Sequence, residues 1–410
     1  MAVRIATFTP KRREESTGAL ESAAAAATIS PGDLVEFSRA LQLLEQTNAR
    51  PGIVTTVPDS MVSNLQSFLS LELPADQGRV LERQQGALEV QFDEHDIIRW
   101  AGVFFTWLGR GGRFEWQTPD APEPLPNRFR AAVLGDWGTG LYGAPVCSRS
   151  IQEDGKYQLL IHVGDVYYSG RTKEYKERFS DLWPKVPAAI SRALNGNHEM
   201  YSGGHAYVDV IRGLGQRASY FALANDHWIL ACLDTAYDDH DLHGDQAAWL
   251  EGLAAAAPGK RLVVFSHHQP FSLLDSQGPK LVARLGRLLA GGRIYAWYWG
   301  HEHHCVLYDQ HPLWKLFGRC VGHSGYPYFR ETKLFGATAP AAATWQIVSG
   351  KNLVPGARVL DGKNVYTGDH PNDYGPNGYV TLEFDGPNLF EIVHEADGHV
   401  LWNQPVGDET

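Results

Sequence analysis

The sequence contains a series of short apolar runs, each of which stops in a polar turn, and this feature most constrains its fold. Runs of four to six apolar residues bounded by such turns are typical of strands buried on both faces of a sheet. Helical patterns lie between several of the runs, and the alternation predicts an α/β fold. The runs with their turns are RAAVLGDWG, LLIHVGDVYY, RALNGNHE, RLVVFSHH and IYAWYWGHEHH.

The residues that end these runs carry oxygen and nitrogen donors. Open α/β sheets bind ligands at the carboxyl ends of their strands, so we expect these side chains to meet. One aspartate after a glycine is an ordinary turn residue, but five consecutive runs that each end in a donor predict a metal site. Carboxylates, an amide and imidazoles without thiolates suit Zn, Mn, Fe, Ni or Co. The candidates are Asp136, Asp165, Tyr168, Asn197, His198, His267, His268, His301 and His303.

Three neighbouring residues fit structural roles better. His162 lies inside the run LLIHVGD and is expected to be a packed, satisfied strand histidine. His304 and Cys305 follow the last candidate ligand, and we expect them to pack or to support the ligands rather than to bind metal. All four cysteines lack CxxC spacing, which favours free thiols in a reducing compartment.

Composition narrows the classes of partner. The net charge of −11 argues against a nucleic-acid surface or an anionic membrane as the main partner. The N-terminus has basic residues without an apolar segment behind them, so it does not resemble a secretory signal. The most apolar helical stretch, Ile97–Leu108, is too short to span a bilayer and is expected to be a core helix. We expect a cytoplasmic protein without a membrane span.

The chain divides into three regions. Residues 1–30 are charged and then alanine-rich, and are expected to be disordered. Residues 31–118 show apolar residues at helical spacing and are expected to be mainly helical. A proline-rich stretch, residues 113–129, is typical of a linker. Residues 128–410 are expected to form the α/β domain, closed by antiparallel strands that turn at Asp385-Gly386 and Asp397-Gly398.

The series GDWG, GDVYY, GNHE, VVFSHH and GHEH closely resembles the calcineurin-like metallophosphoesterases over about residues 128 to 330. That resemblance implies a two-sheet β-sandwich flanked by helices, with two metal ions at the strand ends. Most of the family has histidine two residues after the first aspartate, where this chain has Gly138. Tyr168 stands three residues beyond the second aspartate, and this combination is similar to the purple acid phosphatase branch.

The resemblance also implies ligand sets. The first ion, Fe(III) by this resemblance, would be held by Asp136, Asp165, Tyr168 and His303. The second, a divalent Fe, Zn or Mn ion, would be held by Asp165 as a bridge and by Asn197, His267 and His301. Tyr167 competes with Tyr168, and spacing favours Tyr168. Either His267 or His268 can be the ligand; the family spacing from Val264 selects His267 and leaves His268 to face the substrate phosphate.

The function implied is hydrolysis of a small-molecule phosphate ester. Two ions roughly 3.5–4 Å apart would supply a metal-bound hydroxide that attacks phosphorus in line. His198 is the expected general acid, with Glu199 as support for a ligand. The branch favours phosphomonoesters. A phosphodiesterase that acts on cyclic nucleotides or other diesters is the alternative, and a non-catalytic metal-binding scaffold is a distant one.

Overall fold

The computed structural model describes residues 29–47, 56–72, 97–109 and 112–407 of the chain. They belong to two compact units. The first unit combines residues 1–114 with two short internal segments, residues 167–176 and 198–206. The second unit comprises residues 115–166, 177–197 and 207–410. Of the segment expected to be disordered, residues 1–28 lie outside the described residues.

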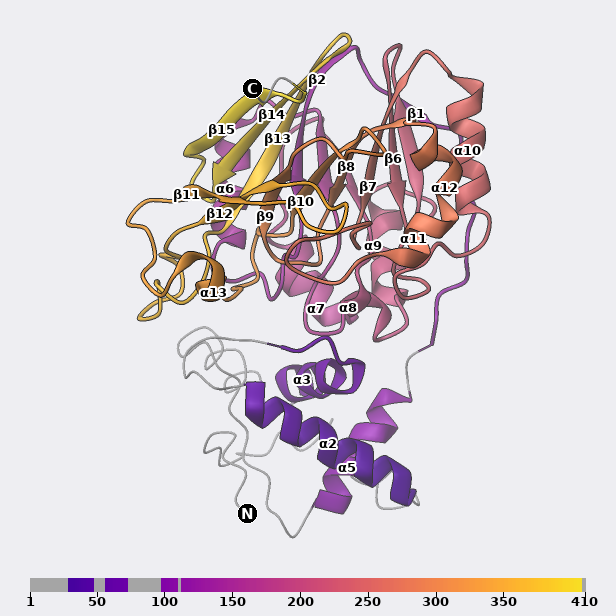
Figure 1. Ribbon diagram of the computed structural model, residues 1–410. Coiled ribbons are helices and arrows are strands. Elements are labelled where there is room, and N and C mark those ends of the chain that lie inside the picture. The colour runs from indigo at the N-terminus through magenta and orange to yellow at the C-terminus, as the bar shows by residue number, and fades with distance from the viewer. Residues whose placement is uncertain (1–28, 48–55, 73–96, 110–111, 408–410) are drawn as a thin grey trace. The chain divides into compact units, whose positions relative to one another are not determined.

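The described N-terminal part of the first unit is helical, as the apolar spacing predicts (Figure 1). Its helices are α2 (Pro31–Thr47), α3 (Ser60–Glu72) and α5 (Ile97–Leu108). Apolar side chains three and four residues apart on α2 and α3 face a common core, because such spacing places them on one side of a helix. The buried members of that core are Phe37, Ala40, Leu41, Leu44, Val62, Leu65, Phe68, Leu69, Ala101, Phe104 and Trp107.

The described part of the second unit contains two sheets. The nine-stranded sheet has the order β1-β5-β6-β7-β8-β10-β9-β12-β11. Its strands are β1 (Glu123–Pro124), β5 (Phe221–Ala224), β6 (Trp228–Leu233), β7 (Arg261–Ser266), β8 (Ile294–Trp299), β9 (Cys305–Tyr308), β10 (Phe317–Val321), β11 (Thr344–Val348) and β12 (Ala357–Asp361). The six-stranded sheet has the order β15-β14-β13-β2-β3-β4. Its strands are β2 (Arg128–Leu134), β3 (Leu159–His162), β4 (Ile190–Ala193), β13 (Gly378–Asp385), β14 (Asn388–Glu395) and β15 (Val400–Pro405).

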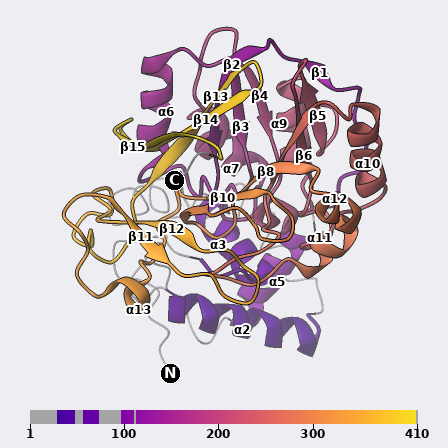
Figure 2. The same cartoon turned by 45° about the horizontal axis from the view of Figure 1, so that its top comes forward.

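The two sheets pack face to face, and helices cover their outer faces, which confirms the expected sandwich. One buried cluster joins residues of both sheets, such as Val133 and Ile161 from one and Val263 and Phe265 from the other. A second cluster joins the opposite face of the nine-stranded sheet to α10 (Gln246–Ala256), α11 (Pro279–Arg284) and α12 (Gly286–Ala290). Figure 2 shows these three helices gathered on one flank.

The pairing of the strands brings the predicted turns to shared sheet edges. β2, β3 and β4 run parallel in one sheet, and β6, β7 and β8 run parallel in the other. β5 and β6 are antiparallel and form a hairpin that turns at Asn225-Asp226. The predicted closing meander is also confirmed, because β13, β14 and β15 are antiparallel and β13 pairs with β2.

Two segments differ from the expected pattern. The proline-rich stretch 113–129 contains β1, which pairs in parallel with β5. Between β3 and β4, where a helical connection is expected, the chain forms α7 (Thr172–Glu174) followed by a π-helical segment, Tyr175–Ser180. The remaining helices are α6 (Ala144–Asp154), α8 (Asn197–Met200), α9 (His205–Gly213) and α13 (Thr332–Phe335).

Among the described residues, every helix is too short or too polar to cross a membrane.

Candidate metal centre

Five strands of the second unit deliver donor side chains just beyond their carboxyl ends. β2, β3 and β4 belong to one sheet, and β7 and β8 belong to the other, so the donors come from both layers of the sandwich. The structure brings together six of the predicted ligands there: Asp136, Asp165, Asn197, His267, His301 and His303.

Glycines in the turns allow the donors to approach one another. A Cβ atom on Gly196 would lie 2.0 Å from Oδ1 of Asp165, and one on Gly300 would lie 2.6 Å from Oδ2 of Asp136. Both distances are far below contact, so any larger residue would displace a carboxylate. The glycine before Asn197 and the glycine before His301 are therefore parts of the site.

Several donors lie on strained backbone. Asp136, Asp165, His301 and His303 have φ values of 55°, 74°, 67° and 57°. Positive φ is uncommon for residues other than glycine, and such strain concentrates at functional sites. Four such residues among six neighbouring donors indicate that the backbone is shaped to present their side chains.

One cluster of donors surrounds Asn197. Its Oδ1 atom lies 3.0 Å from Nε2 of His267 and 3.1 Å from Nδ1 of His301, and Nε2 of His267 lies 3.3 Å from Oδ1 of Asp165. The Nδ1 atom of His267 is 2.9 Å from the carbonyl oxygen of Val163. A carbonyl only accepts hydrogen bonds, so Nδ1 carries the proton, and Nε2 of the neutral ring presents a lone pair. Lone pairs on an amide oxygen, a carboxylate and an imidazole converge, as they do around a cation.

A second cluster contains Asp136, Asp165 and His303, whose donor atoms lie within 4.8 Å of one another. Nε2 of His303 is 3.5 Å from Oδ1 of Asp136. The backbone N–H of His301 donates to Oδ2 of Asp136 at 2.9 Å and holds that carboxylate in place. Asp165 belongs to this cluster and also lies beside His267, which places it between the two sets of donors.

The two buried carboxylates of this site need cations to balance their charge. Asp136 and Asp165 are 0% and 1% exposed, and buried carboxylates need a positive partner. The His301 imidazole does not supply it, because burial, and secondarily the proximity of His267, lower the pKa of His301 well below its usual value. Two buried carboxylates beside imidazoles and an amide oxygen therefore form a donor set that fits metal ions.

The other predicted residues of this region, Tyr168 and His198, belong to the first unit. Nδ1 of His198 donates to the backbone carbonyl of Tyr168 at 2.6 Å, and the ring of Tyr167 packs against the His198 ring with centroids 3.9 Å apart. The Glu174 carboxylate accepts the backbone N–H of Tyr168 at 2.8 Å and the hydroxyl of Ser67 in α3 at 2.8 Å. Helix α3 is thus hydrogen-bonded to the segment that carries Tyr168.

His268 is fully buried beside the first cluster, and sequence reasoning missed a second histidine next to it. The ring of His240 packs on the ring of His268 with centroids 3.8 Å apart. His240 lies in the loop AYDDHDLHG, which as a sequence resembles an acidic turn. The pairing of aspartates with histidines in that loop was the available signal.

The residues expected to be structural are buried. His162 packs among Trp137, Phe179 and Trp183, but neither of its ring nitrogens has a hydrogen-bond partner among the described residues, so the expected satisfaction is wrong. Burial accordingly lowers its pKa to about 3. His304 contacts the Glu302 carbonyl and lies 3.6 Å from Glu331. All four cysteines are buried free thiols, as expected.

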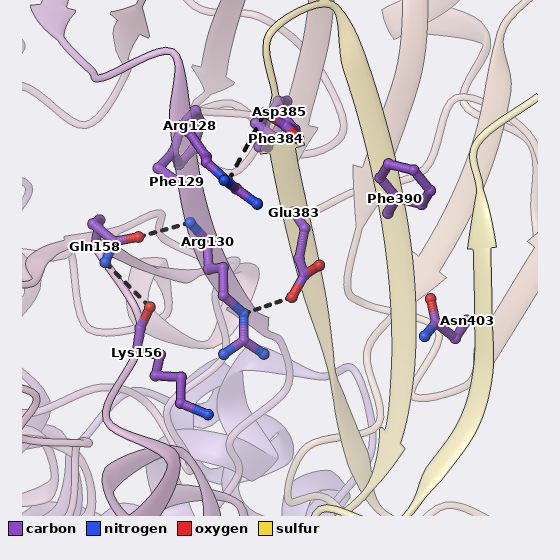
Figure 3. A pocket seen from close by; sticks show the side chains of 10 residues that line it. All are labelled: Arg128, Phe129, Arg130, Lys156, Gln158, Glu383, Phe384, Asp385, Phe390 and Asn403. Atoms are coloured by element: carbon purple, nitrogen blue, oxygen red, sulfur yellow. Dashed lines mark hydrogen bonds and ion pairs between the residues drawn. The ribbon is translucent and has the colours of Figure 1, made fainter.

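A separate cavity of about 780 Å³ lies over β2, β13, β14 and β15, away from these clusters in the second unit (Figure 3). Its carboxylates face arginines: Glu383 is 2.8 Å from Arg130, and Asp385 is 3.8 Å from Arg128. Among the described residues, none of the groups that could hold a metal includes a residue of this cavity. The chemistry of the predicted turns is therefore not located there.

The second unit is thus a sandwich of two sheets with clusters of possible metal ligands at its strand ends. A family model described as calcineurin-like phosphoesterase matches residues 129–305. This match and the clusters of possible metal ligands indicate a metal-dependent enzyme that hydrolyses phosphate esters.

Other similarities are distant. A structure of PhoD has a TM-score of 0.45 and 11% identity, and the match covers 72% of this chain and 74% of that one. A conserved uncharacterized protein of Streptococcus pneumoniae TIGR4, described as a predicted phosphoesterase, has a TM-score of 0.29 and 11% identity over 68% of this chain and 97% of that one. A Vps29 single mutant from Entamoeba histolytica has the same TM-score and identity, with 68% and 98% covered. No curated protein sequence matches the chain.

Proposed function

We propose that the protein is a two-ion phosphomonoesterase whose centre lies at the strand ends of the sandwich. The first ion would be held by Asp136, Asp165, Tyr168 and His303. The second would be held by Asp165, Asn197, His267 and His301. The observation that carries the proposal is the pair of donor clusters that have Asp165 in common. When bound, the two ions would polarise the phosphoryl group and lower the pKa of water at the site.

The protein's own residues would orient the reacting groups. Val163 fixes the tautomer of His267 through its carbonyl, so that Nε2 faces Asn197 and Asp165. The backbone N–H of His301 fixes the Asp136 carboxylate. Such support from the second layer of contacts holds ligands in the geometry that a metal needs.

His198 is the proposed general acid. Its Nδ1–H is committed to the Tyr168 carbonyl, which sets the orientation of the ring and leaves proton transfer to Nε2. In this role, His198 would hand a proton to the leaving oxygen of the ester. Glu199 accepts a hydrogen bond from Tyr175 at 2.9 Å, so its proposed role is to hold the turn that carries Asn197 and His198.

Two sequence features support the preference for monoesters and for iron. Gly138, in place of the usual histidine, has a φ of 65°, a conformation that disfavours a larger side chain. Tyr168 would replace the missing ligand, and a phenolate is a hard anionic donor suited to Fe(III). The second ion would be divalent Fe, Zn or Mn. His268 would lie on the side of the substrate phosphate.

Hydrolysis of p-nitrophenyl phosphate and bis-p-nitrophenyl phosphate by the purified protein, measured side by side with Fe, Zn and Mn, tests the substrate class. Faster hydrolysis of the monoester is expected. Preference for the diester would overturn the monoester assignment and support the phosphodiesterase alternative. Tightly bound metal without hydrolysis of either ester would support a non-catalytic scaffold.

A further inference from the structure

His268 has the same bonding pattern as the proposed ligand that precedes it. Its Nδ1 atom lies 2.9 Å from the backbone carbonyl of Thr235. The carbonyl can only accept, so Nδ1 carries the proton, and Nε2 of the neutral ring presents a lone pair. The residue is 0% exposed, and Nε2 has no hydrogen-bond partner among the described residues; Oδ1 of Asp239 lies 4.0 Å from it, beyond hydrogen-bond distance. A buried nitrogen lone pair without a donor costs free energy unless a ligand meets it.

His240 brings a second imidazole to the same place. Its side chain is 28% exposed, and its Nδ1 atom lies 2.7 Å from Oδ1 of Asp239. The Asp239 carboxylate accepts this hydrogen bond from Nδ1, which leaves Nε2 of His240 to meet a ligand. A carboxylate behind a histidine is the usual way in which proteins orient a metal-binding imidazole. Ring nitrogens of His240, His268 and His301 lie within 4.8 Å of one another.

Hydrogen bonds hold the loop that carries His240 in place. The carboxylate of Asp234 accepts the backbone N–H groups of Ala236 and Tyr237 at 3.0 and 2.8 Å. Lys280 donates to the backbone carbonyl of Asp239 at 3.1 Å, and Arg284 pairs with Asp241 at 3.0 Å. These contacts hold His240 beside His268, as a preorganised ligand requires.

We propose that His240, His268 and His301 form a third cation-binding site next to the proposed two-ion centre. His301 would serve both sites as a bridging imidazolate, because a neutral imidazole has one lone pair, and its second ring proton would pass to solvent when the third ion binds. Three imidazoles with an open position are a known donor set for Zn²⁺. Because the Nε2 of His268 presents a lone pair rather than a proton, the ring itself suits a cation, and the substrate phosphate would meet that cation rather than the ring. We expect this ion to bind more weakly than the other two, because His301 already faces Asn197 and His267.

Zn²⁺ stoichiometry tests the site. The full-length protein is stripped with a chelator and dialysed against a graded series of Zn²⁺ concentrations, and bound zinc per chain is measured by mass spectrometry. We expect three equivalents in the wild type, with the third bound more weakly, and two equivalents in His240→Ala. His243→Ala is the matched control from the same loop, since His243 pairs with Asp238 and packs on Trp116; it should keep three.

Other stoichiometries would overturn the proposal. Two equivalents in both the wild type and His240→Ala would remove the third site and leave the two-ion centre intact. Three equivalents of zinc bound to His240→Ala would also contradict a third site that includes His240. Fewer than two in the wild type would overturn the two-ion centre as well. Because His240 is partly exposed, His240→Ala should fold; a circular dichroism spectrum equal to that of the wild type checks this, and the wild-type stoichiometry decides independently of any variant.

Discussion

The Nε2 atom of His267 faces the Oδ1 atom of Asn197 at 3.0 Å, with the Nδ1 proton of the same ring committed to the Val163 carbonyl. Two lone pairs therefore point at each other in a site where the imidazole is fully buried. This arrangement is unfavourable without a cation between the donors and favourable with one. The neighbours of the two adjacent histidines differ: Nε2 of His267 faces Asn197 and Asp165, whereas His268 is grouped with His240 and His301.

His267→Ala is expected to lose bound metal and to lower the rate of phosphoester hydrolysis by on the order of 10²-fold or more, because a direct ligand matters at least as much as a supporting contact. His268→Ala is the matched control and should retain both ions of the centre. Metal analysis and turnover of the two purified variants check this. If His268→Ala loses the two-ion centre and His267→Ala retains it, the ligand assignment is reversed.

His198→Ala is expected to keep both ions but to lose about 10²- to 10⁴-fold in turnover, the usual contribution of a general acid. Metal content and kcat, measured on the same preparation, separate this role from that of a ligand. The loss should shrink for a substrate with a very acidic leaving group, because such a group departs without a proton. Full activity in His198→Ala would remove the residue from the mechanism.

Glu174→Ala is expected to lower the free energy of unfolding by about 3 kcal/mol, because it leaves several buried donors without an acceptor. The Glu174 carboxylate accepts the N–H groups of Tyr168, Ser169 and Arg171 at 2.8, 3.2 and 3.0 Å, besides the hydroxyl of Ser67. Ser67→Ala removes one of these contacts and should cost about 1 kcal/mol. Urea denaturation measures both variants; equal stability of Glu174→Ala and wild type would show that the network is not stabilising.

His323 should make stability depend on pH. It is buried, and burial lowers its pKa from 6.5 to about 3, outweighing a backbone interaction with Val321 that acts in the opposite direction. The unfolded chain therefore binds a proton between these values while the folded chain does not, so stability is lost as the pH falls below 6.5. Between pH 6.5 and 4 the wild type should lose about 3 kcal/mol more than His323→Leu. Parallel losses in urea denaturation at both pH values would contradict this.

Much of the sandwich could be predicted because its information is local. Each buried strand is an apolar run, and each donor follows its strand directly, so order along the chain places Asp136, Asp165 and His301 at strand ends before any pairing is known. The long-range pairing of strands has no such local signal. No pattern in the C-terminal strands indicates that β13 pairs with β2. The predicted domain boundaries, with a helical region that ends at residue 118 and an α/β domain that begins at residue 128, stay a prediction.

Two parts of the site could not be read from the sequence. The hydrogen bond from Ser67 to Glu174 joins residues 107 positions apart, with no local pattern to reveal it. His240 was missed because its loop is rich in aspartate and has no apolar run ending beside it. Its closeness to His268 arises from tertiary packing, in which a loop after β6 meets the end of β7.

The most direct test of the central claim is metal-restored hydrolysis of p-nitrophenyl phosphate by chelator-treated protein, in the wild type and in Asp165→Asn. Asp165 is the carboxylate common to both donor clusters, so its loss should impair both ions at once. The wild type should recover hydrolysis when Fe, Zn or Mn is returned, and Asp165→Asn should not. Hydrolysis that survives the chelator, or that recovers equally in Asp165→Asn, would contradict a two-ion centre built on this residue.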